Sequence, residues 1–266
     1  MRTLTLWLCA ACPSLVLAQI PAISEGGILN GASFAPGQAV ARGSLVSIFG
    51  TDLAGGLTSA SSIPLSTTLA DVSVTFNGMA APILFVSPGQ INAQIPWEVL
   101  GGGASSGMAT AIVRRGGASS QPRDFQIAPF SPGIFSVQFG VGNAIAVNPD
   151  GSLAAPENSI MGVRTQPARI GDTIIVYANG LGVTDPPGRT ANNSVDALRR
   201  TTTVPTVLIG GVEAQVPFSG LAPEFVGVNQ LNVVVPSGVM PGVVPIQLRM
   251  GGITTTDQVT IAIRAP

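Results

Sequence analysis

Chemistry in this 266-residue chain has to come from carboxylates, amides, hydroxyls and a few aromatic rings, because the sequence has no histidine and all twelve basic residues are arginines. Nucleophile systems built on histidine, Schiff bases on lysine and the phosphate-binding lysine of a P-loop are therefore excluded. Both cysteines, Cys9 and Cys12, lie near the N-terminus, so the usual zinc and copper ligands are missing from the rest of the chain. We accordingly expect no catalytic residues, no cofactor and no metal centre of these kinds.

One enzymatic hypothesis survives this exclusion, because glycoside hydrolysis needs only two carboxyl groups about 5 to 10 Å apart. The chain has thirteen aspartates and glutamates, but they are scattered singly and no two of them form a motif. Beyond the first 18 residues, Trp97 and Tyr177 are the only tryptophan and tyrosine that could stack on a sugar ring. A carboxylate-only glycoside hydrolase is therefore a remote alternative, and solvated carboxylates in turns are the simpler interpretation.

The best candidate for a bound cation is a turn in the middle of the chain. Asn148, Asp150 and Ser152 place side-chain oxygens at alternate positions, and calcium prefers oxygen ligands. An ordinary Asn-Pro-Asp-Gly turn explains the same residues without a metal. We therefore treat these three residues as a weak candidate metal site and expect no metal there.

A polar strip in the segment QINAQIPWE is the candidate surface for a ligand or partner. Gln90, Asn92 and Gln94 alternate with apolar residues and so share one face of a strand, with Trp97 and Glu98 at its end. Large aromatic side chains commonly anchor interfaces, so this strip could bind a glycan or a partner strand. The alternative is structural: the amides hydrogen-bond neighbouring loop backbone, and Trp97 fills the interior of a sandwich.

Strands must position these candidates. Glycine and proline, 33 and 22 residues, punctuate short apolar runs in the manner of turns between strands. Disorder is excluded because hydrophobic residues reach 45%, more than chains that cannot form a core contain. No stretch longer than about ten residues keeps an uninterrupted helical period, so helices should be few. The composition therefore predicts an all-β protein.

The period of individual segments predicts where several strands lie. Residues 45–49 and 173–177 are nearly continuous apolar runs, typical of central strands. The alternation from Val212 to Phe218 is typical of a strand with one wet face. Tight hairpin turns need positive φ and are predicted at four dipeptides, Asn77-Gly78, Gly116-Gly117, Gly210-Gly211 and Gly251-Gly252.

Two copies of one unit account for most of the chain. Four blocks recur in the same order: ARGSLVSIFG (41–50) with PARIGDTIIVYANG (167–180), VSVTFNG (72–78) with PTVLIGG (205–211), QINAQIP (90–96) with QLNVVVP (230–236), and AIVRRGG (111–117) with IQLRMGG (246–252). About seven short strands per copy predict two tandem immunoglobulin-like β-sandwich domains arising from an internal duplication. We place the domains at residues 19–130 and 131–266, with a stiff junction containing IFSVQF between them.

The duplication also separates scaffold from candidate function. Gln230 and Asn232 repeat the amides of the first copy, which favours a structural role for that pair. Trp97 and Glu98 are not repeated, because Ser237 and Gly238 stand in their places. The features present in one copy only are Trp97 with Glu98, the turn at 148–152 and the long loop at 185–200. These are the places where we expect function.

The first 18 residues predict export. Arg2 precedes an apolar run from Leu4 to Leu17, and Ala18 follows as a small residue suited to cleavage. About 14 apolar residues is too short for a membrane-spanning helix, which needs about 20. We therefore expect a signal peptide, no transmembrane segment after its removal, and a secreted, periplasmic or cell-surface protein. Lipidation at Cys12 is an open alternative to release.

A string of motifs carries a resemblance that covers about residues 28–263. Asn30-Gly31-Ala32-Ser33-Phe34, GSLVSIFGTDLA, SPGQINAQIPW, SPGIF, PARIGD and YANGLG resemble the Solibacter C-terminal family, an uncharacterised module of exported acidobacterial proteins. Each copy also resembles an IPT/TIG-type immunoglobulin-like domain, with Phe49-Gly50-Thr51 at the turn after the first strand. The resemblance implies an exported all-β module and no established activity.

The function that follows from the sequence is a non-catalytic secreted or cell-surface interaction or adhesion module, binding an extracellular polysaccharide or protein. A passive structural spacer of an extracellular assembly is the alternative. Nucleic acid is not an expected partner, because the net charge is −1 and the arginine pairs at 114–115 and 199–200 are isolated. Exposed strand edges would also permit self-association.

Overall fold

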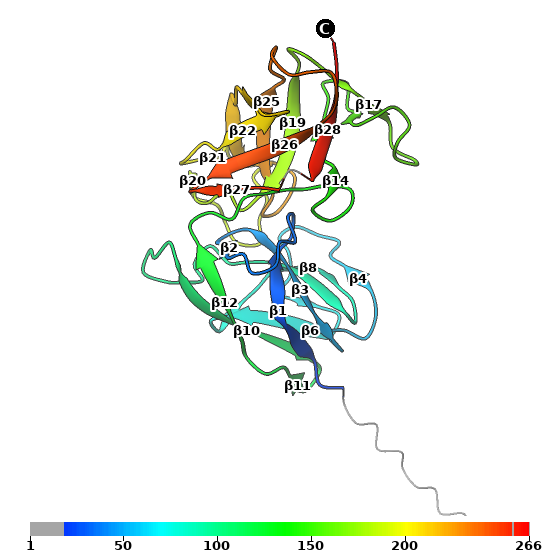
Figure 1. Cartoon of the computed structure of the whole chain (residues 1–266). Helices are drawn as coiled ribbons and strands as arrows, with labels where there is room; N and C mark the ends of the chain where they lie inside the picture. Colours follow the sequence, from blue (N-terminus) through cyan, green and yellow to red (C-terminus); the bar gives the residue numbers. More distant parts are fainter. Residues whose placement is uncertain (1–18, 257, 266) are drawn as a thin grey trace, which may run out of the picture.

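The computed structural model describes residues 19–256 and 258–265, so the predicted signal peptide and Cys12 lie outside the described residues. Two β-domains lie one above the other, with the N-terminal domain below and the C-terminal domain above (Figure 1). The described part of the chain contains strands and turns and no helix. It therefore offers no helix with the length and apolarity to cross a bilayer.

The first domain is a sandwich of two sheets. One sheet has the order β1-β3-β9-β8-β4 and the other β2-β12-β10-β6-β5, with β11 beside β10 and β7 beside β6. The strands are β1 (Ala22–Asn30), β2 (Val40–Ala41), β3 (Leu45–Thr51), β4 (Thr58–Ser59), β5 (Thr68–Leu69), β6 (Val72–Phe76), β7 (Met79–Ala80), β8 (Ile83–Val86), β9 (Gln90–Gln94), β10 (Gly107–Arg115), β11 (Ala118–Ser119) and β12 (Arg123–Ala128).

The second domain repeats this plan. One sheet has the order β17-β16-β15-β19-β25-β24-β21-β20 with β13 beside β19, and the other β14-β28-β26-β22-β23 with β18 and β27 alongside. The strands are β13 (Gly133–Ile134), β14 (Gly142–Asn143), β15 (Ala146–Val147), β16 (Leu153–Ala154), β17 (Thr165–Gln166), β18 (Ala168–Arg169), β19 (Thr173–Asn179), β20 (Thr184–Asp185), β21 (Arg200–Thr201), β22 (Thr206–Ile209), β23 (Val212–Ala214), β24 (Phe218–Leu221), β25 (Asn229–Val234), β26 (Gly242–Met250), β27 (Ile253–Thr254) and β28 (Val259–Arg264).

Strand pairing confirms the duplication. The antiparallel pair β3–β9 corresponds to β19–β25, and β6–β10 corresponds to β22–β26. Even the parallel contact of the short strand β2 with β12 has its counterpart in β18 with β28. Strands β3 and β19 each lie between two partners, as their continuous apolar sequences predicted. The fold is therefore two tandem immunoglobulin-like sandwiches.

Each sandwich encloses its own hydrophobic core. All members of one buried cluster lie between Ile23 and Ile127, and all members of the other lie between Ile134 and Ile263. Burial follows the predicted alternation in β9, where Ile91 and Ala93 are fully buried while Gln90 and Asn92 are partly exposed. The partly buried Phe130 packs against the second cluster, and the domain boundary at residue 130 stays a prediction.

The predicted hairpins form, but one predicted strand is divided. Gly210 and Gly211 both have positive φ in the turn between β22 and β23, as a tight primed turn requires. The run from Val212 to Phe218 was expected to be one strand, and this prediction is wrong. Its first three residues form β23, which pairs with β22, whereas its last residue, Phe218, begins β24, which pairs with β25 in the opposite sheet. The chain changes sheets around Pro217, which has no N–H to continue a ladder.

The junction between the domains is held by backbone hydrogen bonds. Of the IFSVQF segment, only Ile134 belongs to a regular strand, β13. The Phe135 N–H donates to the Tyr177 carbonyl at 3.0 Å, and Ser136 forms a bridge with Ala144. The junction thus runs along the edge of the second domain's sheet.

Candidate functional site

The structure divides the predicted polar strip into two parts. Gln90 and Asn92 lie on the outer face of the first domain, where the Gln90 amide donates to Asn92 Oδ1 at 2.7 Å. The Ser47 hydroxyl donates to the same oxygen at 3.0 Å. The second domain has the same pair, with the Gln230 amide donating to Asn232 Oδ1 at 2.9 Å. These amides bond to side chains of their own sheet, not to loop backbone.

The other part of the strip faces the second domain. Gln94 is 1% exposed, and its Oε1 accepts from the Ala191 N–H at 2.8 Å. The backbone N–H of Trp97 donates to Thr190 Oγ1 at 3.1 Å, and the Thr190 hydroxyl donates to a Glu98 carboxylate oxygen at 2.7 Å. Trp97 and Glu98, which only the first copy has, therefore meet the long loop that only the second copy has. We call this set of contacts the interdomain clasp.

The candidate metal turn is held by its own hydrogen bonds, except that the buried Asn148 Oδ1 has no partner among the described residues. The Asp150 carboxylate accepts from the Ser152 hydroxyl at 2.6 Å and from Arg164 at 2.6 Å. These contacts, the Ser152 bonds foremost, hold the pKa of Asp150 below its usual range. The Asn148 amide donates to Ser152 Oγ at 3.0 Å. A cation at Asp150 would have to compete with these donors, and within the described residues no three His, Cys, Asp or Glu side chains gather around a metal position.

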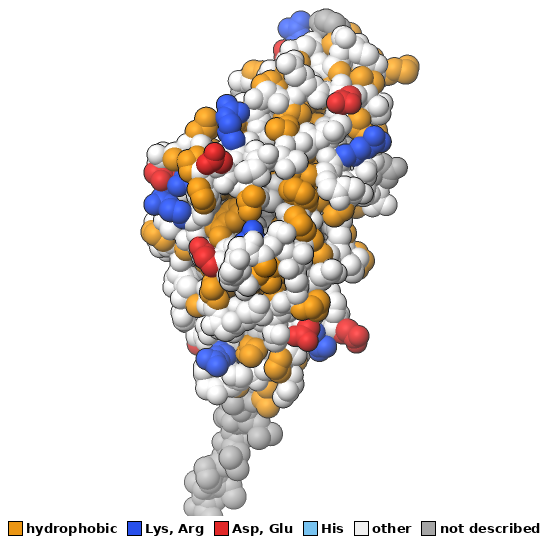
Figure 2. Space-filling view, turned by 90° about the vertical axis from the view of Figure 1, so that its left-hand side faces the viewer, with side chains coloured by type: hydrophobic (Ala, Val, Ile, Leu, Met, Phe, Trp, Pro, Cys, Tyr) orange, Lys and Arg blue, Asp and Glu red, His pale blue; other side chains and the backbone are white. Residues whose placement is uncertain are grey.

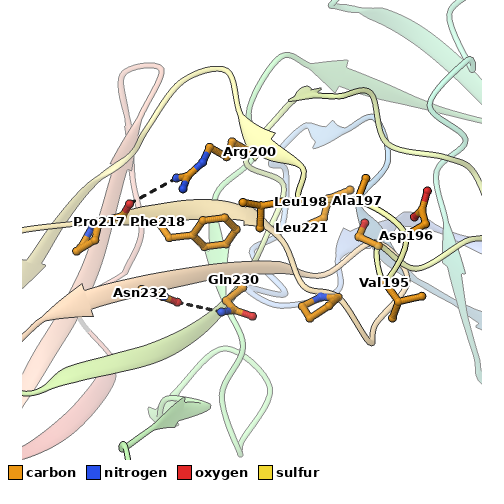
Figure 3. Close-up of a pocket in the computed structure, with 12 residues that line it drawn as sticks. Val195, Asp196, Ala197, Leu198, Arg200, Pro217, Phe218, Leu221, Gln230 and Asn232 are labelled. Carbon is orange, nitrogen blue, oxygen red and sulfur yellow. Dashed lines mark hydrogen bonds between the residues drawn. The ribbon is translucent and has the colours of Figure 1, made fainter.

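The strongest candidate for a ligand site is a groove of about 670 Å³ on the second domain. Its floor is the outer face of β24 and β25, which presents Phe218, Gln230 and Asn232, and its wall is the segment 194–198. The guanidinium of Arg200 lies 5.0 Å from the centre of the Phe218 ring (Figure 3). The groove thus combines apolar surface with three planar polar groups.

The floor of the groove belongs to the duplicated scaffold, but its wall does not. Phe85 lies opposite Asn92 in the first domain as Phe218 lies opposite Asn232 in the second. Arg200 and the segment 194–198, by contrast, belong to the long loop and its end. The sequence singled out that loop but missed Phe218, and the repetition of Gln230 and Asn232 in both copies pointed to a structural role for that pair. The loop insertion beside them was the signal that could have identified the groove.

One charged cluster holds the wall in place. The buried Arg199 guanidinium donates to both carboxylate oxygens of Asp196, at 2.8 and 3.1 Å. Arg189 lies 3.1 Å from the same carboxylate. The hydrogen bonds from Arg199, aided by the positive charge of Arg189, lower the pKa of Asp196 to about 2. Elsewhere charges are sparse: on the face in Figure 2 they are scattered, whereas hydrophobic side chains gather across the middle.

The Asp196 cluster predicts a pH dependence. Because the pKa of Asp196 is lower in the folded protein than its ordinary 3.8, its contribution is complete above about pH 5 and is lost as the pH falls toward 2. Asp196→Asn should therefore lower the urea midpoint at pH 6, while at pH 2, where the wild-type carboxylate is about half protonated, the difference should be much smaller. Urea unfolding at both pH values measures this, and a difference that is the same at both would contradict it.

Comparison with known proteins bears on the fold. A family model described as IPT/TIG domain matches residues 33–152. No curated protein matches. A Bacteroides ovatus mixed-linkage glucan utilization locus SGBP-B, solved in complex with a mixed-linkage heptasaccharide, is 11% identical with a TM-score of 0.33, over 85% of this chain and 44% of that one. This chain thus spans less than half of that structure.

Two further solved structures are similar at the same level. Domains 5–6 of the S-layer protein SbsC are 10% identical over 92% of this chain and 99% of that one, with a TM-score of 0.28. The I9–I11 tandem of titin is 12% identical over 93% and 67%, with a TM-score of 0.22. The narrower Solibacter resemblance stays a prediction. The first half of the chain is similar to the IPT/TIG domain, in accord with its immunoglobulin-like sandwich.

Proposed function

We propose that this protein is a non-catalytic extracellular binding module that holds a polysaccharide in the groove of its second domain. The observation that supports this most is the composition of the groove: an aromatic ring, a guanidinium and two side-chain amides face one open surface of about 670 Å³. Concave sites that combine apolar surface with a few oriented polar groups are the usual form of small-ligand sites.

The chemistry of the groove fits a sugar. Sugar rings present C–H groups on their faces and hydroxyls at their edges. Leu198 and Phe218 can contact the C–H groups, while the amides of Gln230 and Asn232 can donate to and accept from hydroxyls. Arg200, which forms no ion pair among those of the described residues, can bind adjacent hydroxyls or a uronate carboxylate. Neutral and uronate-bearing polysaccharides therefore both belong to the proposed class.

The groove favours binding over hydrolysis. Asp196 is the only carboxylate in its lining, and Arg199 and Arg189 already engage it. Glycoside hydrolysis needs a second carboxyl group across the bond to be cleaved. Export, which rests on the predicted signal peptide, would bring the groove into contact with polysaccharides outside the cell.

Affinity electrophoresis in gels containing dextran, xylan, β-glucan, alginate or polygalacturonate tests the proposal. We expect retardation by at least one of these. Phe218→Ala and Arg200→Ala should each weaken that binding by about tenfold or more, since central aromatic and arginine contacts are typically worth above 1 kcal/mol. Retardation only by the uronate-containing polysaccharides would indicate that Arg200 binds a uronate carboxylate.

The first domain offers a matched control. Phe85 lies opposite Asn92 as Phe218 lies opposite Asn232, but it does not line the groove, so Phe85→Ala should leave affinity unchanged. Equal losses from both substitutions would contradict the groove as the site. Migration unaffected by every polysaccharide would instead favour the second candidate, a rigid spacer, for which the interdomain clasp is the supporting observation.

A further inference from the structure

The loop at 185–200 connects two places that are distant in the sequence. Its first half contacts the first domain at the clasp, and its second half forms the wall of the groove on the second domain. Contacts that hold the first half of the loop against the first domain can therefore also position its second half beside the groove.

The loop docks on Trp97 by close packing. The indole lies between Gly43 of the first domain and Gly188 of the loop, and a Cβ added to either glycine would collide with the ring. Only glycine allows the backbone to approach the indole so closely. The backbone N–H of Trp97 also donates to Thr190. The ring and the backbone of Trp97 therefore both hold the loop.

Ala191 strengthens the attachment. Its N–H donates to Gln94 Oε1 at 2.8 Å, and its carbonyl accepts from the Leu65 N–H at 2.9 Å. The φ of Ala191 is 68°, which is uncommon for a residue other than glycine. Such a conformation persists where the surroundings over-determine it, as two hydrogen bonds to the first domain do here.

Buried Arg199 connects the docked part of the loop to the wall of the groove. Its Nε donates to the Pro187 carbonyl, next to the docked Gly188, at 2.9 Å. The same guanidinium holds Asp196 in the wall of the groove, and the Arg199 carbonyl accepts from the Leu221 N–H at 2.9 Å. A continuous chain of contacts therefore runs from Trp97 through Pro187 and Arg199 to the wall.

We propose that the first domain shapes the groove of the second through this loop, so that Trp97 and Gly188 are positioning residues for the ligand. The ligand would contact neither of them. The proposal rests on the proposed function as far as the ligand is concerned, whereas the coupling between clasp and groove can be measured without one.

Gly188→Ala tests the coupling most directly. Gly56→Ala is the matched control, because neither glycine has positive φ and a Cβ at Gly56 meets nothing within 4 Å. Amide hydrogen exchange of the full chain, without ligand, should become about tenfold or more faster at Ser194 and Leu221 in Gly188→Ala, and stay unchanged in Gly56→Ala. Exchange in the core strands β19 and β25 should not change in either variant.

Thr190→Val is a second variant in case Gly188→Ala does not fold. It keeps the shape of the side chain and removes the hydroxyl through which the loop bonds to Trp97 and Glu98 of the first domain. Amide exchange at Ser194 and Leu221 should therefore become faster, as in Gly188→Ala. Faster exchange confined to residues 188–191, with the groove amides unchanged, would overturn the proposal.

Affinity for whichever polysaccharide retards the wild type separates this proposal from the preceding one. If the coupling positions the ligand site, Gly188→Ala and Trp97→Ala should weaken that affinity about tenfold or more, and Trp97→Phe should restore part of it. Faster groove exchange together with no polysaccharide binding by the wild type would support the coupling and reject the ligand. Unchanged affinity despite faster groove exchange would reject the positioning role.

Discussion

Asn179→Ala is expected to destabilise the protein strongly. Asn179 is fully buried, and its side chain pairs with the backbone of Leu45 in the other domain as a neighbouring strand would. Its Oδ1 accepts from the Leu45 N–H at 3.0 Å, and its Nδ2 donates to the Leu45 carbonyl at 2.8 Å. Removing it leaves the buried Leu45 N–H without a partner, whereas the Leu45 carbonyl keeps a hydrogen bond from the Gly31 N–H at 3.0 Å.

The expected loss is about 2 to 5 kcal/mol, because one buried group left unsatisfied costs about 1 to 3 kcal/mol and each of the two hydrogen bonds that the Asn179 amide donates contributes about 1 kcal/mol. The Asn179 amide also donates to Asn30 Oδ1 at 3.0 Å, so the substitution weakens the fixation of the turn after β1 as well. Chemical unfolding in urea, followed by circular dichroism, measures the loss. We expect the two domains to unfold in separate transitions in the variant if the seam between them has opened.

Asn232→Ala is the control for this prediction. Asn232 is a half-buried amide on an outer face and bonds to the Gln230 side chain. Its replacement should cost no more than about 1 kcal/mol, the usual net worth of one hydrogen bond. If Asn179→Ala were as mild as Asn232→Ala, the pairing with Leu45 would not stabilise the domain seam.

Gly180→Ala is expected to have an effect of similar size for a different reason. Gly180 has a φ of 74°, and a Cβ there would collide with the Ser131 carbonyl oxygen. Ser131 cannot move away freely, because its N–H donates to the Gly180 carbonyl at 2.8 Å and its carbonyl accepts from the Asn30 amide at 2.6 Å. The collision therefore disrupts the same seam as the loss of Asn179.

We expect a loss of about 2 to 5 kcal/mol, the sum of a left-handed backbone at about 1 to 2 kcal/mol and overpacking at about 1 to 3 kcal/mol. Gly211→Ala separates the two contributions, because Gly211 has a φ of 82° and a Cβ there meets nothing within 4 Å. Guanidinium chloride unfolding should show only the backbone part for Gly211→Ala. Equal losses for the two variants would show that the contact with Ser131 does not matter.

Local patterns in the sequence predicted the scaffold because local forces decide it. The alternation in residues 90–96 and the continuous runs at 45–49 and 173–177 correspond to β9, β3 and β19. The turn at Gly210-Gly211 forms because only positive φ closes so short a hairpin. The division of the 212–218 run escaped prediction, because alternation does not report which sheet a strand joins.

The position of the Trp97 side chain in the fold could not be predicted from the residues next to it in the sequence. The sequence offered a place in the sandwich interior or a free binding surface, and the structure puts the ring between two glycines that belong to different domains. The contact with Gly188 joins residues about ninety positions apart. No periodicity carries information over that distance.

The sequence by itself determined that the chain is all-β, duplicated, and without the residues of common catalytic and metal sites. It also narrowed the search to features present in one copy only, although the floor of the proposed groove takes Gln230 and Asn232 from the scaffold that both copies share. Only the tertiary structure decided that two of these features, Trp97 with Glu98 and the loop at 185–200, bind each other across the domain seam. The physical reason is that strands and turns follow from local backbone preferences, whereas a seam of buried amides and close-packed glycines forms only when two folded surfaces meet.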